Sequence, residues 1–146
     1  MHDFRKLSGG VLASPQLTLA DVETARSDGV KTIINNRPEG EAADQTPGPL
    51  IEAAARKAGM DYVSIPIRPG EFTNAQVQAM ADALSRAEGK VLAYCRTGTR
   101  STLLWALARA KSGVPIETIA SAASSAGYDV SPIMPALTAF AEQATR

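Results

Sequence analysis

The sequence predicts an α/β protein with a mainly parallel central sheet and helices on both of its faces. Short runs rich in β-branched residues alternate with longer runs of helical period. Glycine and proline mark the ends of most of these runs. Each inner strand is followed by a helix, and this order produces parallel strands that are covered on both sides. The inner strands are predicted at Lys31–Asn36, Asp61–Ile67 and Lys90–Cys95.

The chain is expected to begin with a strand pair and a helix. Phe4–Ala13 is predicted to hold two short strands joined by a pair of glycines. The stretch Ser14–Gly29 predicts a turn and then a helix. Thr18 is a good N-cap, Asp21 lies in the first turn, and a glycine ends the run.

Further helices are predicted between and after the inner strands. One runs from about Pro49 to Ala58. Another begins at Thr73, because Gln76 follows three residues later as in a capping box. The remaining helices are predicted at 99–113, from Pro115 to Gly127, and from Ser131 onward.

The composition excludes several classes of protein. The formal net charge is zero, with 15 basic and 15 acidic residues, so the overall charge does not favour nucleic acid or anionic membranes. A single cysteine excludes an internal disulfide framework and a zinc cluster of thiolates, and the only histidine is His2. No apolar run approaches the ~20 residues that span a bilayer. We therefore expect one cytoplasmic domain, residues 1–146, with no metal, no cofactor, and no nucleic-acid or membrane partner.

The cysteine lies in the stretch AYCRTGTRSTLLWALA. Cys95 ends a predicted strand and Ser101 opens a predicted helix, so the chain must turn sharply, and Gly98 supplies the backbone freedom. Successive N–H groups in such a turn form a nest for an anion, and the helix adds the positive end of its dipole. Two arginines add fixed charge. The predicted anion-binding loop comprises Arg96, Thr97, Gly98, Thr99, Arg100 and Ser101.

The same field favours the thiolate form of Cys95. We therefore expect Cys95 and Arg100 to be catalytic, with the loop holding an anionic substrate over the nucleophile. The alternative is a buried structural cysteine beside an ordinary turn.

The loop resembles the active sites of two enzyme classes. CRTGTRS resembles the Cys-Arg-x-Gly-x-Arg loop of rhodanese-type sulfurtransferases, which Cys95, Arg96, Gly98 and Arg100 match. It is also similar to the Cys-x5-Arg loop of protein tyrosine and dual-specificity phosphatases. In that pattern the arginine would fall at Ser101, one residue later than it does here.

The wider chain resembles the beta-lactamase-hydrolase-like family. SPQLT, INNRPEGE, IPI and YCRTGTRS carry this resemblance, which covers about Leu7 to Ala110. It implies a dual-specificity-phosphatase-like fold. Members of the family are described both as phosphatases and as sulfurtransferases linked to sulfide oxidation. Some carry a fused metallo-β-lactamase-like sulfur dioxygenase domain, which this chain is too short to contain. The resemblance also implies sulfide-oxidation enzymes as partners.

Two departures from the phosphatase pattern favour sulfur transfer. The shorter loop makes a tighter ring of amides, which suits one persulfide sulfur better than the three equatorial oxygens of a phosphoryl group. The general-acid aspartate expected after a strand like IPI is replaced by RPGE. Glu71, Glu39 and Glu41 are candidates to take its place, and the alternative for each is a solvated loop charge.

We therefore expect a sulfurtransferase. Cys95 would attack the outer sulfur of thiosulfate, a polysulfide or a small persulfide, and Arg96 or Arg100 would orient this anionic donor. An acceptor thiol would then remove the sulfur. Two alternatives remain open: a phosphoester hydrolase with a phosphocysteine at Cys95, and a non-catalytic sensor of persulfides or anions.

Other side chains near the loop have two interpretations. Arg37 and Glu39 are expected near Cys95, either lining the pocket or forming a turn. Ser101 and Thr102 either donate hydrogen bonds to the thiolate or cap the helix. Core packing is expected for Tyr94 and Trp105.

Overall fold

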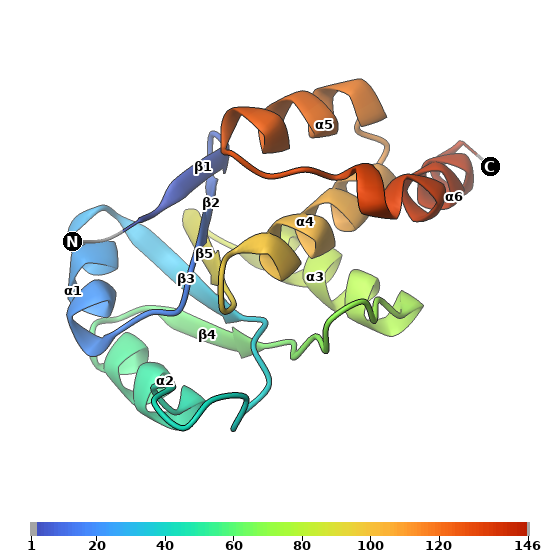
Figure 1. Ribbon diagram of the computed structural model, residues 1–146. Coiled ribbons are helices and arrows are strands. Elements are labelled where there is room, and N and C mark those ends of the chain that lie inside the picture. Colours follow the sequence, from blue (N-terminus) through green and yellow to red (C-terminus); the bar gives the residue numbers. More distant parts are fainter. Residues whose placement is uncertain (1–2, 146) are drawn as a thin grey trace.

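The computed structural model describes residues 3–145 and has three layers, with a central sheet between two groups of helices (Figure 1). The strands are β1 (Arg5–Ser8), β2 (Val11–Ser14), β3 (Val30–Asn35), β4 (Asp61–Ser64) and β5 (Lys90–Tyr94). Their order in the sheet is β1-β2-β5-β3-β4. β1 and β2 are antiparallel and the other neighbouring strands are parallel, which confirms the predicted class.

β5 lies in the middle of the sheet and carries Cys95 to its edge. Ser14 and Asn35, on the neighbouring strands, lie in register with Tyr94. Main-chain pairing continues past the strand ends. The Cys95 N–H donates to the Ser14 carbonyl at 3.3 Å, and the Asn36 N–H donates to the Tyr94 carbonyl at 2.8 Å. The carboxyl ends of three parallel strands therefore meet around Cys95, which is where open α/β sheets bind ligands.

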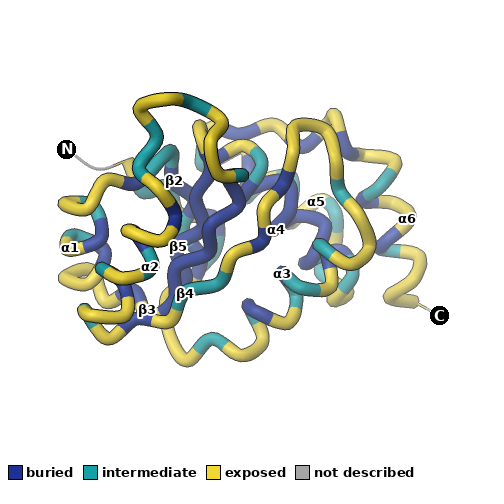
Figure 2. The backbone as a smooth tube through the Cα atoms, turned by 90° about the horizontal axis from the view of Figure 1, so that it is seen from below, coloured by how far each residue is buried: buried dark blue, intermediate teal, exposed yellow. Residues whose placement is uncertain are grey.

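The two faces of the sheet pack in separate apolar cores. Leu92 and Tyr94 lie in the core beneath α1 (Leu19–Ser27) and α2 (Gly48–Lys57), and the alternate residues of β5 face the other core. The helices of the second core are α3 (Asn74–Arg86), α4 (Thr99–Lys111), α5 (Ile116–Ser125) and α6 (Met134–Ala144), with a 3₁₀ turn at Ser131–Ile133. Figure 2 shows the central strands and α4 as the buried middle of the molecule.

α4 is buried on almost every side because α3, α5 and α6 pack around it. Trp105 on this helix is 3% exposed and Tyr94 is 1% exposed, so both expected core placements are confirmed. No helix within residues 3–145 combines the length and the apolar character needed to cross a membrane.

The predicted helix starts agree with the structure where a cap is encoded. Thr18 and Asp21 form a capping box at α1, and Thr73 and Gln76 form another at α3. The last helix starts less directly, since a 3₁₀ turn precedes α6.

β4 is shorter than predicted, because it ends at Ser64 and not at Ile67. Beyond Ser64 the alternate residues Ile65 and Ile67 face the successive residues Asn35 and Asn36, so the regular register is lost there, and Pro66 is tolerated because β4 is an edge strand. The chain nevertheless stays beside β3: the N–H groups of Ile65 and Ile67 each donate to carbonyls of the segment that ends β3, at 2.9 Å. This extension brings the Ile67 carbonyl to the Cys95 edge of the sheet.

Candidate active site

Cys95 stands between β5 and α4, in a short loop that is tied to the rest of the edge. The carbonyl of Arg96 accepts a hydrogen bond from the N–H of Gln16 at 3.2 Å. With the bond from Cys95 to Ser14, this fixes the start of the loop against the chain that leaves β2. The sequence prediction that Cys95 lies at a strand-to-helix turn is confirmed.

Gly98 supplies the contact that holds the sulfur. Its N–H donates to Cys95 Sγ at 3.1 Å. Gly98 is also the N-cap of α4 and has a φ of +92°, a conformation that costs little only for glycine. A Cβ at this position would lie 2.1 Å from the hydroxyl oxygen of Tyr128. Backbone conformation and side-chain space therefore both require glycine here, and the positive end of the α4 dipole is at Cys95.

Arg100 is the guanidinium of the site, and it is held by Glu41. Its Nη1 donates to Glu41 Oε2 at 2.7 Å and its Nη2 donates to Oε1 at 2.9 Å. Nη1 also donates to the Ile67 carbonyl at 2.7 Å. The bond to Glu41 raises the pKa of Arg100, and the nearby Cys95 sulfur acts in the same direction. The arginine predicted to be catalytic thus lies beside the nucleophile.

Glu41 bridges Arg100 to a second arginine. Arg37 donates from Nε to Glu41 Oε1 at 2.9 Å and from Nη1 to Gln16 Oε1 at 2.9 Å, and its side chain is 5% exposed. The hydrogen bond from Arg100, with that from Arg37, lowers the pKa of Glu41 to about 2. Two guanidinium groups against one carboxylate leave one excess positive charge beside Cys95, so the site is suited to an anion.

The other side chains of the predicted anion-binding loop are either exposed or bonded to groups other than the Cys95 sulfur. Arg96, Thr97 and Thr99 are exposed, and the two threonine hydroxyls bond to each other at 3.0 Å. Ser101 donates to Asn36 Oδ1 at 2.7 Å, and Thr102 donates to the Gly98 carbonyl at 2.9 Å. Neither hydroxyl donates to the Cys95 sulfur, and neither caps α4, whose N-cap is Gly98, so both roles expected from the sequence are wrong.

Of the three residues predicted to border the pocket, only Arg37 takes part in the cluster around Arg100. Glu39 turns the other way: its Oε1 accepts from the N–H of Gly48, so it caps α2. Glu71 is exposed in the turn after Gly70, and its N–H bonds to the Arg68 carbonyl. The carboxylate that meets Arg100 is Glu41, which the sequence offered only as one of three acid candidates.

Three residues of the site had not been singled out from the sequence as site residues. Asn36 is fully buried, accepts from Ser101 and donates to the Ile65 carbonyl at 2.9 Å. The sequence does contain a signal for Asn36, because a side-chain amide directly after a buried strand needs a hydrogen-bond partner at that edge of the sheet. Gln16 and Tyr128 carried no such signal, since the folded chain brings them to the loop from distant segments.

Cys95 itself has no exposed surface in this structure. Its sulfur is covered although a guanidinium and an amide N–H lie beside it. A reaction at Cys95 therefore requires a local movement that admits the other reactant. The segment 38–47, which carries Glu41, is largely exposed and joins β3 to α2.

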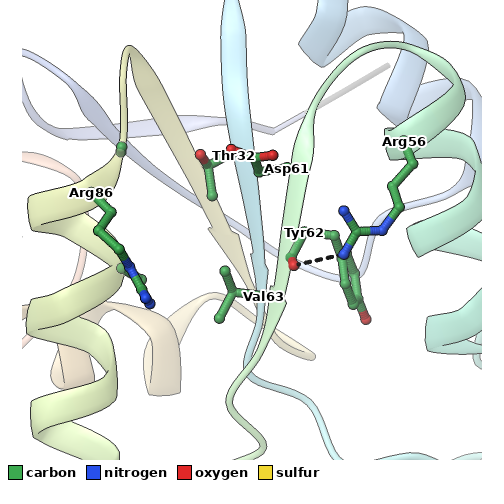
Figure 3. A pocket seen from close by; sticks show the side chains of 8 residues that line it. Thr32, Arg56, Asp61, Tyr62, Val63 and Arg86 are labelled. Carbon is green, nitrogen blue, oxygen red and sulfur yellow. Dashed lines mark hydrogen bonds between the residues drawn. The ribbon is translucent and has the colours of Figure 1, made fainter.

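A separate hollow of about 270 Å³ lies against β3 and β4, away from Cys95 (Figure 3). Asp61, at the amino end of β4, lines it together with Thr32, its partner in register. Arg56 and Arg86 border it from two helices, and Arg56 donates to the Tyr62 carbonyl at 3.4 Å. This hollow and the Cys95 site lie toward opposite ends of the parallel strands.

Comparison with known proteins identifies the kind of domain. Residues 3–112 match the family described as "Beta-lactamase hydrolase-like protein, phosphatase-like domain". The chain is 39% identical over 98 residues to the Beta-lactamase hydrolase-like protein of Agrobacterium fabrum, a match that covers 67% of this chain and 23% of that protein. The chain thus spans about a quarter of the length of this curated relative.

Solved structures share the fold. A protein of Neisseria meningitidis Z2491, presented in its crystal structure as a candidate phosphatase, is 35% identical with a TM-score of 0.84, covering 96% of this chain and 99% of that one. Tk-PTP in its active form superposes with a TM-score of 0.77 at 17% identity over 97% of each chain, a likeness of fold alone. The protein belongs to the beta-lactamase hydrolase-like family through its phosphatase-like domain, as its sequence motifs had indicated.

Proposed function

We propose that Cys95 is the nucleophile of a sulfurtransferase carried on this phosphatase-like domain. The supporting observation is the state of Glu41, the carboxylate closest to the reactive arginine. Its bonds to Arg100 and Arg37 hold its pKa at about 2, so it is ionised at neutral pH and has no proton to give. Cleavage of a phosphoester bond benefits from a general acid at the leaving oxygen. Sulfur transfer needs none, because sulfite and thiolates leave as anions.

The reaction would proceed in two balanced steps. The Cys95 thiolate attacks the outer sulfur of thiosulfate; a new S–S bond forms, the old one breaks, and its electron pair leaves with sulfite. An acceptor thiolate then attacks the outer sulfur of the Cys95 persulfide, and Cys95 leaves as thiolate. The Gly98 N–H and its neighbours in the loop would hold the charged sulfur, and Arg100 would draw in the anionic donor.

The expected partners follow from this chemistry. The donor is a small anion such as thiosulfate or a low-molecular-weight persulfide, and the acceptor is a thiol. Enzymes of sulfide oxidation would supply or consume these species.

A second candidate is phosphoester hydrolysis through a phosphocysteine at Cys95. The comparisons favour it more directly than they favour sulfur transfer, since the matched family is described as a phosphatase-like domain and the Neisseria protein is presented as a candidate phosphatase. Here Cys95 would attack phosphorus, the ester oxygen would leave, and water would release phosphate. The proton donor would have to be a group other than Glu41 in its present state.

Turnover assays in parallel separate these functions. The protein and its Cys95→Ser variant are given thiosulfate with cyanide, glutathione persulfide with a thiol acceptor, and p-nitrophenyl phosphate. We expect Cys95-dependent turnover of a sulfur donor that exceeds hydrolysis of the aryl phosphate. Cys95-dependent hydrolysis with no sulfur turnover would overturn the proposal in favour of the phosphatase. Sulfur that loads once and is never passed on would overturn it in favour of a sensor.

A further inference from the structure

The peptide unit between Thr97 and Gly98 has both of its polar groups engaged. Its N–H donates to Cys95 Sγ at 3.1 Å, and its carbonyl accepts from the Tyr128 hydroxyl at 3.2 Å. The peptide is trans, so these two groups point in opposite directions. Tyr128 and Cys95 are therefore bonded to opposite edges of one rigid peptide unit.

Tyr128 is itself fixed in place from two directions. Its N–H donates to the Ala123 carbonyl at the end of α5, and the Arg5 guanidinium of β1 lies 5.2 Å from the centre of its ring. Arg5 is held in turn by the Ala126 carbonyl at 3.3 Å. Tyr128 is 8% exposed, and its burial raises its pKa, so the hydroxyl stays protonated and remains a donor at neutral pH.

We infer that Tyr128 is a positioning residue for Cys95, acting through the orientation of the 97–98 peptide. The inference rests on Cys95 being the nucleophile of the proposed function. Without the hydroxyl, the carbonyl loses its partner and the peptide is free to rotate. A rotated peptide would turn a carbonyl oxygen toward the sulfur and repel a thiolate. The hydrogen bond to the carbonyl also polarises the peptide and strengthens its N–H as a donor.

Tyr128 lies outside the part of the chain that matches the family domain. The match ends at residue 112, and Tyr128 follows α5. The helices after β5 would therefore do more than cover one face of the sheet. They would bring a phenol to the back of the nucleophile loop.

Several charged or titratable groups surround the sulfur and must be separated from this effect. Arg100 and Tyr128 are near enough to interact electrostatically with it, Glu41 and Arg37 lie behind Arg100, and Arg5 lies behind Tyr128. The Tyr128→Phe substitution keeps the ring, its contact with Arg5 and all of the charges. It removes only the hydroxyl.

The experiment is a pH titration of the thiolate by its ultraviolet absorbance, taken as the difference between each protein and the same protein with Cys95→Ser. The matched control is Tyr62→Phe. Tyr62 is also part-buried and bonded through its hydroxyl, to Asn35 Nδ2 at 2.9 Å, but it lies in the other core. We expect Tyr128→Phe to move the midpoint up by about 0.5–1 pH unit, as the weakening of one hydrogen bond to a charged group implies, and Tyr62→Phe to leave it in place.

Hydrogen exchange of the Gly98 amide gives a second, local readout. We expect exchange at Gly98 to be several-fold faster in Tyr128→Phe and unchanged in Tyr62→Phe. An unmoved midpoint with unchanged Gly98 exchange would overturn the inference, as would equal shifts in both variants. Neither readout uses a sulfur donor or a phosphate ester. A failure of this inference is therefore distinguishable from a failure of the proposed reaction, which the turnover assays report.

Discussion

Glu41 and Arg100, which are 59 positions apart in the sequence, form a bidentate ion pair beside the buried sulfur of Cys95. The Arg100 side chain is 12% exposed and that of Glu41 is 21% exposed, so the pair is only partly screened by water. Two N–H groups of Arg100 already donate to the Glu41 carboxylate, and Nη1 also donates to the Ile67 carbonyl. An incoming anionic donor that binds the same two N–H groups must therefore compete with Glu41. The pair therefore links substrate access to the stability of the site.

Replacing Glu41 with glutamine is expected to strengthen the attraction of the site for anions. The excess positive charge beside Cys95 would rise by one, and Arg100 would lose its two-pronged partner. The ratio of the alkylation rates of Cys95 by iodoacetate and by neutral iodoacetamide should increase by several-fold. Glu52→Gln is the matched control, because Glu52 pairs with Arg56 on an exposed helix face. An equal ratio in all three proteins would contradict the competition between Glu41 and the anion.

The same pair predicts how stability changes with acid. The folded pKa of Glu41 is about 2, below its ordinary value of 4.5. A lowered folded pKa stabilises the protein above pH 4.5, and this contribution is lost as the pH falls from 4.5 toward 2. Urea unfolding at pH 7, 4 and 3 should show the free-energy difference between the protein and Glu41→Gln shrinking over this window. A difference that stays constant would mean that Glu41 is not held by the arginines in solution.

Gly98→Ala is expected to damage both the fold and the nucleophile loop. The new Cβ would lie 2.1 Å from the Tyr128 hydroxyl oxygen, on a backbone with φ of +92°. We expect a loss of about 2–4 kcal/mol in the free energy of unfolding. Gly113→Ala isolates the backbone part, because Gly113 has φ of +94° and nothing within 4 Å of the added Cβ. Equal losses in the two variants, measured by urea unfolding, would refute the close contact with Tyr128.

Ser101→Ala tests whether the Ser101 hydroxyl stabilises the Cys95 thiolate or contributes to the stability of the fold. Ser101 donates to Asn36 Oδ1 within a buried pair, so its loss would leave the amide oxygen without its donor. The free energy of unfolding should fall by about 1–3 kcal/mol, with the thiolate midpoint of Cys95 unmoved. A raised midpoint with unchanged stability would show that the hydroxyl turns to the sulfur in solution.

The sequence predicted those parts of the molecule that depend on local signals. Neighbouring residues determine three such parts: the β-branched strand that ends at Asn35, the helix caps at Thr18 and Thr73, and the strand-to-helix turn at Cys95. Their positions follow from periodicity, capping and the need for a glycine at the turn. The exception is the end of β4, where the regular register is lost beyond Ser64 although the apolar run looks continuous.

The site depends on longer-range geometry, which limited its prediction. Glu39 and Glu41 are chemically equivalent in the sequence, but the turn through Gly40, with φ of +75°, sends one to α2 and the other to Arg100. Tyr128 lies beside the Thr97 carbonyl because α5, which precedes it, packs beside β1. No spacing rule connects it to the cysteine, since 31 positions separate it from its acceptor.

The intact mass of the protein tests the central claim most directly. The protein and its Cys95→Ser variant are incubated with excess thiosulfate or glutathione persulfide, desalted, and weighed by mass spectrometry before and after exposure to cyanide. Since Cys95 is the only cysteine, a persulfide has one possible position. We expect one added sulfur atom on the protein, none on the variant, and its removal by cyanide. An unchanged mass with both donors, from protein that hydrolyses p-nitrophenyl phosphate steadily, would contradict sulfur transfer at Cys95.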